Sequence, residues 1–157
     1  MSNYYAKICM NGHIFVESIP LNKNEYCVRC GSKLISSCPD CKSVIKEWHY
    51  QNVIVCYTPK LELPMYCRSC GNPFPWTISA LESTKLAIQE DEQLSGLDCQ
   101  RLEESLTDLL NENPKTQVAI IRTKKALSSV GKFTADAIRQ FIIDFGCELA
   151  KKAILDP

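Results

Sequence analysis

The sequence predicts a small α+β protein in two parts, an N-terminal half of short β-hairpins and a C-terminal bundle of about four helices. Two observations predict this division. Seven of the ten cysteines belong to closely spaced sets between Cys9 and Cys70. Hydrophobic residues recur with a helical period only from Pro75 onward. We therefore expect one domain over residues 1–75 and a second over residues 76–157.

The composition excludes several classes of protein. A hydrophobic fraction of 45% is too high for a disordered chain. The 18 basic side chains are balanced by 18 acidic ones, whereas a general binder of phosphate backbones has a basic excess. The chain shows no signal-peptide pattern and no uninterrupted apolar run of about 18 residues. We expect a cytoplasmic protein without a transmembrane segment, in which cysteines stay reduced.

Short β-rich runs alternate with turns before Pro75. Runs of this length are too short to bury a sheet core of their own, so this half needs another source of stability. Bound metal ions can supply it, because their binding free energy is folding free energy. The runs are Ile14-Phe15-Val16, Lys33-Leu34-Ile35, Val44-Ile45 and Val53-Ile54-Val55-Cys56-Tyr57.

Helical spacing predicts three helices after the β-rich half. Pro75 suits the first turn of one helix, and a second helix with an apolar stripe starts at about Asp98. Asn113-Pro114 is typical of a helix start, so a third helix should run from there toward Gly131. The apolar positions are Trp76, Ile78, Leu81, Leu86 and Ile88 in the first helix, Cys99, Leu102, Leu106 and Leu109 in the second, and Val118, Ile121 and Leu127 in the third.

A fourth helix is expected to continue through Gly146 and to end at Lys151 and Lys152, where cations suit the helix dipole. Its apolar residues, which include Ile143 and Cys147, cover a broad arc. The arc fits either a central helix with several neighbours or a contact with a second copy, a protein partner or a membrane surface. We expect the C-terminal helices to bind a protein partner or to self-associate. The main apolar face is Ile138, Phe141, Ile142, Phe145 and Leu149.

The N-terminal half contains four pairs of side chains that typically bind metal. Three are Cys-x-x-Cys turns, and the fourth pairs Cys9 with His13. A Cys-x-x-Cys turn directs two sulfurs toward one point, and two such turns complete the tetrahedral site that Zn²⁺ takes. The chain is therefore expected to hold two structural Zn²⁺ ions. The expected ligands are Cys9, His13, Cys27, Cys30, Cys38, Cys41, Cys67 and Cys70.

The spacing leaves two groupings of these pairs open. In a sequential arrangement the first pair joins the second and the third joins the fourth. In a cross-brace arrangement, as in RING-type fingers, the pairs interleave. The sequential arrangement is favoured because it closes shorter loops at a lower entropic cost. Gly31 and Gly71 directly follow the second cysteine of their turns, where positive φ lets the turn close.

The order of the turns resembles the common bacterial zinc ribbon, in which a Cys-Pro-x-Gly-His turn is followed by a Phe-Cys-x-x-Cys-Gly turn. This chain has Cys9-x-x-Gly12-His13 and then Tyr26-Cys27-x-x-Cys30-Gly31. Its full pattern, which ends in Tyr66-Cys67-x-x-Cys70-Gly71-x-Pro73-Phe74-Pro75-Trp76, is similar to a family of uncharacterised bacterial proteins known only as a domain of unknown function. The resemblance implies a double zinc-ribbon fold and supplies no activity.

Two positions depart from the ribbon pattern. Met10 stands where the ribbon usually has proline, and Lys42 replaces the usual glycine after Cys41. Neither change removes a ligand, so the expectation of two zinc sites stands.

These features favour a non-catalytic binding protein, and its best-fitting role is a protein–protein interaction or adaptor module. Two complete four-ligand sites leave no coordination position for an activated water. The sequence has no phosphate-binding loop, nucleophile elbow or metalloprotease helix. We therefore do not expect an enzyme. His49 and Cys56 are expected in strands, and Cys99 and Cys147 in helix packing.

Three other functions stay open. A nucleic-acid-binding ribbon could use Arg29 and Lys33 beside Tyr26. It is less favoured because residues 1–76 carry eight basic and five acidic side chains, and seven thiolates with two divalent ions bring that half near neutrality. A RING-like ligation adaptor would need the cross-brace arrangement. A zinc-based redox switch would release its metal when the cysteines are oxidised.

Overall fold

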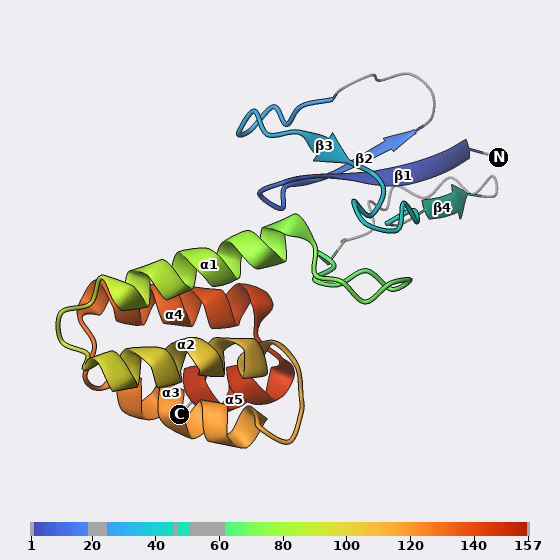
Figure 1. Cartoon of the computed structure of the whole chain (residues 1–157). Coiled ribbons are helices and arrows are strands. Elements are labelled where there is room, and N and C mark those ends of the chain that lie inside the picture. Colours follow the sequence, from blue (N-terminus) through green and yellow to red (C-terminus); the bar gives the residue numbers. More distant parts are fainter. Residues whose placement is uncertain (1, 19–24, 46, 51–61, 157) are drawn as a thin grey trace. The chain divides into compact units, whose positions relative to one another are not determined.

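The computed structural model shows two compact units, residues 1–78 and residues 79–157 (Figure 1). The first unit holds the strands and the cysteine turns, and the second is helical. This is the predicted α+β class. Each unit is treated by itself below. The residues that the structure describes are 2–18, 25–45, 47–50 and 62–156.

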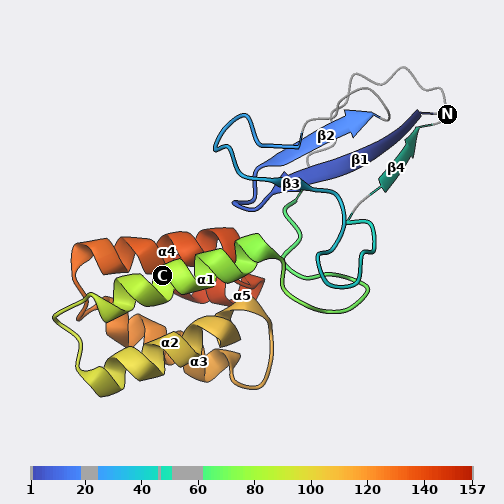
Figure 2. The ribbon, with the colours of Figure 1, turned by 45° about the horizontal axis from the view of Figure 1, so that its top comes forward.

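Strand β1 (Ser2–Cys9) is the central strand of the sheet in the first unit (Figure 2). On one edge it pairs antiparallel with β2 (Ile14–Ser18). On the other edge it pairs with two strands in turn, β4 (Glu47–Tyr50) near its beginning and β3 (Leu34–Ile35) at its end. One long strand thus organises three short ones, and its last residue is Cys9, the first of the predicted metal ligands.

The sheet confirms some of the predicted strands and corrects others. The runs around Ile14 and Leu34 form β2 and β3. Val44 makes a single bridge to Ser37, so the run Val44-Ile45 is not a strand. The run that starts at Val53 lies outside the described residues. Strand β1 is not among the predicted strands. One of its edges pairs with the next strand, β2, and the other pairs with β3 and β4, which lie far from it in the sequence.

A cluster of aromatic rings closes the first unit around Trp76. The indole Nε1 donates to the carbonyl oxygen of Pro64 at 2.7 Å. The indole stacks on the ring of Phe74 with 4.7 Å between centroids, and both residues are buried. Gly12 also lies against Trp76, since a Cβ at Gly12 would be 3.4 Å from the Trp76 Cβ. The turn that carries His13 is therefore fixed to the start of the first helix.

The described part of the chain contains five helices, and none of them is long and apolar enough to cross a membrane. Pro75 is the first residue of α1, as predicted. The Ser95 hydroxyl caps α2 by accepting from the N–H of Asp98 at 3.2 Å. The Asn113 side chain accepts from the N–H of Lys115 at 2.7 Å in the turn before α3. The helices are α1 (Pro75–Gln89), α2 (Gly96–Leu110), α3 (Thr116–Leu127), α4 (Lys132–Phe145) and α5 (Glu148–Leu155).

One apolar core closes the second unit. The predicted stripe of α2 is confirmed, since Leu102, Leu106 and Leu109 are fully buried. The predicted stripe of α3 is wrong at Val118 and Ile121, which are 48% and 66% exposed, whereas Leu127 packs against the core as predicted. Consecutive apolar residues in this helix allow more than one face to be chosen from spacing alone. The residues of α3 that face the core are Ala119, Ile120 and Thr123.

The predicted fourth helix is two helices, because the chain breaks at Gly146. Gly146 has an extended backbone (φ −64°, ψ 147°). A Cβ at this position would lie 2.6 Å from the carbonyl oxygen of Ile142, so only glycine fits without a backbone shift. The N–H of Cys147 then donates to the carbonyl oxygen of Leu109 at 2.8 Å. The chain is turned toward the end of α2, and the bundle has five helices rather than about four.

Polar contacts hold the start of α4 against the end of α1. The Asp91 carboxylate accepts from the N–H of Gly131 at 2.9 Å. The buried Thr134 hydroxyl lies beside Asp91 and 3.3 Å from the carbonyl oxygen of Ala87. Hydrogen bonds from the Thr134 side chain and from the N–H groups of Gln93 and Gly131 hold the pKa of Asp91 below its usual value. The two helices are therefore fixed in an antiparallel arrangement.

We expect Gly146→Ala to lower the free energy of unfolding by about 2 kcal/mol, because the added methyl group must displace backbone. Gly96→Ala is the matched control, since no heavy atom lies within 4 Å of a Cβ at that position. The control should lose no stability. Urea unfolding followed by far-UV circular dichroism measures both variants. Equal stabilities of the two variants would show that the close approach to Ile142 does not restrict position 146 to glycine.

Candidate metal centres

The structure brings the eight predicted ligands together in two groups of four. Within each group, one ligand atom from every residue lies within 4.8 Å of the others. Consecutive pairs share a group, which is the sequential arrangement. The interleaved arrangement that a RING-like adaptor requires is not the one observed. The first cluster is Cys9, His13, Cys27 and Cys30, and the second cluster is Cys38, Cys41, Cys67 and Cys70.

The distances in the first cluster match the edges of a metal-centred tetrahedron. Zn–S bonds of about 2.3 Å and Zn–N bonds of about 2.0 Å give S···S edges of about 3.8 Å and S···N edges of about 3.5 Å. Cys9 Sγ lies 3.7 Å from Cys30 Sγ. His13 Nδ1 lies 3.5 Å from the sulfurs of both Cys9 and Cys27. His13 therefore faces the cluster with Nδ1, and the four donors fit one ion.

The second cluster has the same dimensions with four sulfurs. Cys38 Sγ lies 3.8 Å from Cys70 Sγ, and Cys41 Sγ lies 3.7 Å from Cys67 Sγ. These separations are far longer than the roughly 2.05 Å of a disulfide, and all four cysteines are free. Three thiols with an imidazole and four thiols are the donor sets of structural zinc sites. Each cluster could hold one tetrahedral ion.

The same backbone turn presents the ligands three times. The N–H of the first cysteine in each Cys-x-x-Cys turn donates to the carbonyl five residues later at 2.7–2.8 Å. Its own carbonyl accepts from the N–H four residues later at 2.7–3.0 Å. The first cysteine is buried and the second is exposed. The turns begin at Cys27, Cys38 and Cys67. Local hydrogen bonds therefore place two sulfurs of each turn on the same side.

Each of these turns closes through a residue with positive φ. The angles are 73° at Gly31, 77° at Gly71 and 62° at Lys42. Glycine adopts this conformation readily, whereas a residue with a Cβ loses roughly 1–2 kcal/mol. Lys42 is the one non-glycine residue with positive φ in the described part of the chain. Its Nζ donates to the carbonyl oxygen of Pro39, a local contact within the same turn. The turn that begins at Cys38 is therefore the strained one.

Serine side chains beside the clusters lower the thiol pKa of Cys30, Cys41 and Cys67 and so favour their thiolate form. Hydrogen bonds from the side chain and backbone of Ser32 lower the pKa of the Cys30 thiol to about 5. The Ser43 hydroxyl lies 3.0 Å from Cys41 Sγ and 3.4 Å from Cys67 Sγ. It lowers the pKa of the Cys67 thiol to about 6. Since the thiolate is the form that binds metal, both serines prepare their clusters for an ion.

One asparagine in each cluster links two of the turns. Asn11 Nδ2 donates to Ser32 Oγ at 2.9 Å and to Cys30 Sγ at 3.4 Å. Asn72 Nδ2 donates to the Asp40 carboxylate at 3.0 Å. The predicted site contains none of these residues. A repeated signal is nevertheless present, because a serine or asparagine stands two residues after the second cysteine of every Cys-x-x-Cys turn. These residues are Ser32, Ser43 and Asn72.

The other histidine and two other cysteines lie outside both clusters. His49 is in β4, opposite Asn3 of β1, and is thus in a strand as expected. Cys99 Sγ donates to the carbonyl oxygen of Ile88 at 3.4 Å, and burial raises the pKa of its thiol. Cys147 packs against the helical core as the residue that precedes α5. Position 56 lies outside the described residues.

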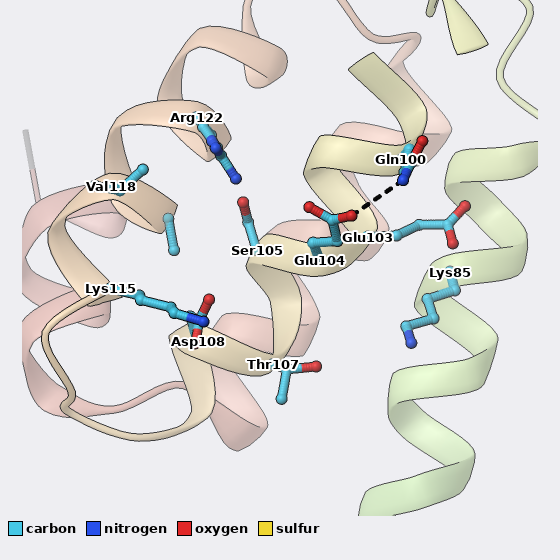
Figure 3. Close-up of a pocket in the computed structure, with 11 residues that line it drawn as sticks. Lys85, Gln100, Glu103, Glu104, Ser105, Thr107, Asp108, Lys115, Val118 and Arg122 are labelled. Atoms are coloured by element: carbon cyan, nitrogen blue, oxygen red, sulfur yellow. Dashed lines mark hydrogen bonds between the residues drawn. The ribbon is translucent and has the colours of Figure 1, made fainter. Parts of the chain in front are cut away.

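The second unit has a polar groove of about 770 Å³ between α1, α2 and α3 (Figure 3). Glu103 is directed toward Lys85 across it, and Gln100 donates to Glu104 at 3.2 Å. The buried Ser105 hydroxyl is bonded to a carbonyl of its own helix at 2.7 Å. The charged residues that line the groove are three cations and three acids, Lys85, Lys115, Arg122, Glu103, Glu104 and Asp108. The groove is charge-balanced, and its lining residues show no paired nucleophile and base.

The fold and the two clusters define an α+β protein with two four-ligand cysteine and histidine sites, each able to hold a metal ion. The chain belongs to the bacterial family described as "Uncharacterized protein conserved in bacteria (DUF2321)", which matches residues 2–154. Comparisons with curated proteins and with solved structures found no match. The resemblance inferred from the ribbon motifs is confirmed, and it extends over the helical unit.

Removal of ligands in pairs tests the grouping. We expect Cys30→Ser and Cys41→Ser each to lower the bound metal by one equivalent, because a tetrahedral structural site needs all four donors. The double variant Cys9→Ser/Cys30→Ser should also lose one equivalent, since both changes fall in the first cluster. The double variant Cys30→Ser/Cys41→Ser should lose both. Elemental analysis of protein purified under reducing conditions measures this. Loss of both ions from Cys9→Ser/Cys30→Ser would support interleaved pairs instead.

Relief of the strained turn should stabilise the second cluster. We expect Lys42→Gly to raise the free energy of unfolding of the metal-loaded protein by about 1 kcal/mol, because glycine takes positive φ readily. Gly71→Ala is the matched opposite change. No heavy atom lies within 4 Å of a Cβ there, so its expected loss comes from the backbone alone. Guanidinium unfolding followed by tryptophan fluorescence compares the variants. A destabilised Lys42→Gly would show that the Lys42 side chain matters more than its backbone conformation.

Proposed function

We propose that each cluster holds one Zn²⁺ ion in a structural role and that the protein is a non-catalytic zinc-binding protein. The S···S separations of 3.7–3.8 Å and the purely sulfur and imidazole donors support zinc over hard cations. Four protein ligands per ion leave no position for a reacting water. Each ion would contribute folding free energy on the order of 10 kcal/mol to a unit of short strands.

We further propose that the zinc-bearing unit binds another protein. The observation that carries this is the exposure of apolar side chains on the turns of the first cluster. Val28 is 84% exposed and Tyr26 is 62% exposed. Met10, also exposed, donates its N–H to Lys33, and Tyr26 pairs with the same lysine, so these side chains come from adjoining backbone. Apolar and aromatic side chains on a firmly held backbone are typical anchors of protein interfaces.

Partner capture with matched variants tests this role. Full-length zinc-loaded protein is used to capture partners from a lysate of its own bacterium. We expect Val28→Asp and Tyr26→Ser to retain two zinc equivalents and to lose the captured partner at least tenfold. Leu97→Asp is the control, because Leu97 is 57% exposed but lies in the helical unit. Undiminished capture by both first-unit variants would count against the proposed surface.

A nucleic-acid role has one observation in its favour. Tyr26 is exposed beside the exposed Lys33, and the exposed Arg29 lies next to Val28 in the same turn. An aromatic ring beside cations can stack on a base and hold a phosphate. Retention on single-stranded DNA or RNA at low salt, reduced by Arg29→Gln/Lys33→Gln, would favour this role. An absence of retention would leave the protein-binding role as the better supported one.

A further inference from the structure

An apolar groove of about 490 Å³ runs between α1 and α4 of the second unit. Small residues on both helices leave it open, and larger ones border it. Phe133 is 78% exposed and Leu86 is 59% exposed, although the helical core is already closed without them. The apolar residues on which the argument depends are Ala80, Leu86, Ala87, Phe133, Ala137 and Phe141. This surface has the character of an interface rather than of an ordinary solvated face.

The groove carries negative charge at its two ends. Its charged lining residues are Glu90 and Asp144, and no cation lines it. Because Asp91 binds Gly131, the end of α1 lies beside the start of α4, so Glu90 is at the Phe133 end. Asp144 lies near the end of α4, about 16 Å further along the helix. The Gln140 amide donates to both carboxylate oxygens of Asp144 at 3.1 Å and 3.0 Å.

Helix α3 carries a surface of the opposite character. Val118 and Ile121 are exposed one turn apart, at 48% and 66%. The helix contains Arg122, Lys124 and Lys125 and no acidic residue. Its twelve residues span about 18 Å, a length close to that of the groove, and its three cations lie together in the last two turns. Length, apolar character and charge of α3 therefore complement the groove.

We propose that α3 of one copy of this chain docks in the α1–α4 groove of a second copy. Val118 and Ile121 contact Leu86 and Phe133, and the cations in the last two turns of α3 approach one of the two acids of the groove. A symmetric contact of groove with groove would oppose acid to acid. A contact of α3 with α3 would bring together two surfaces that are both positively charged. Like charges disfavour both, so the mixed contact is the one that electrostatics selects.

The positions of the two surfaces decide the form of the assembly. In Figure 1, α1 and α4 lie at one edge of the helical unit and α3 lies at the opposite edge. A copy that has docked its α3 still has an open groove, so the contact is head-to-tail and can continue to further copies. One helix in one groove buries less than the roughly 1,200 Å² of a stable complex. The assembly is therefore weak, reversible and dependent on concentration. This inference concerns the helical unit and does not depend on the proposed zinc-unit interface.

Analytical ultracentrifugation of the full metal-loaded chain over a range of concentrations tests the proposal. We expect the average mass to rise with concentration beyond that of a dimer and to fall as salt is added, because salt screens the charges. Ile121→Asp removes the apolar ridge, and Phe133→Asp removes the groove border. Each should weaken association at least tenfold. Leu97→Asp, at an exposed apolar residue outside both surfaces, should leave it unchanged.

Mixing the two single variants tests most directly whether α3 of one copy binds the groove of another. Ile121→Asp retains an intact groove and Phe133→Asp retains an intact α3. An equimolar mixture should therefore form a dimer that grows no further, although each variant alone is monomeric. Circular dichroism confirms that both variants fold, and Glu90→Lys/Asp144→Lys provides a second way to disable the groove. A monomer at every concentration would overturn the proposal. So would a mixture that stays monomeric, or assembly that survives both single variants.

Discussion

The convergence of eight donor atoms on two points is the constraint on which the first unit depends. Most of its strands are short, and among the residues whose burial the structure describes the buried apolar ones apart from the cysteines are few: Ala6, Ile8, Ile45, Phe74 and Trp76. So small a core does not balance the conformational entropy of nearly eighty residues. The ligand turns compensate through local hydrogen bonds that hold each pair of sulfurs in place. The side chains of Asn11, Ser32, Ser43 and Asn72 make their hydrogen bonds around the clusters rather than within the sheet.

The second unit depends on a different kind of force. Its helices bury a continuous set of leucine, isoleucine and phenylalanine side chains, and its polar contacts mainly set where helices begin and end. Asp91 illustrates this, since it follows α1 and binds the backbone that starts α4 forty residues later. The interior of this unit is closed without the exposed apolar side chains Val118 and Ile121 of α3 and Leu86 and Phe133 of the α1–α4 groove. The two units therefore offer two separate surfaces, one set by ligand turns and one by helix faces.

Spacing in the sequence predicts well which side chains come together in the two clusters, because a Cys-x-x-Cys turn is a local structure whose geometry is contained in a few residues. The same holds for Pro75 at the start of α1 and for the leucine stripe of α2. The sequence fails where the outcome depends on distant partners. Strand β1 is defined by three segments that pair with it, and the side of α3 that faces the core is chosen by its neighbours. The direction of the chain after the break at Gly146 depends on the hydrogen bond from Cys147 to Leu109, which no local pattern contains.

The sequential grouping of the turns also affects the order in which parts of the chain can fold. All four donors of the first cluster lie between Cys9 and Cys30, and those of the second between Cys38 and Cys70. The first cluster can thus be completed during synthesis while the rest of the chain is still being made. The second can follow before any helix of the bundle exists. Short ligand separations of this kind give low contact order, which favours fast folding and little exposure of reactive thiolates in half-formed sites.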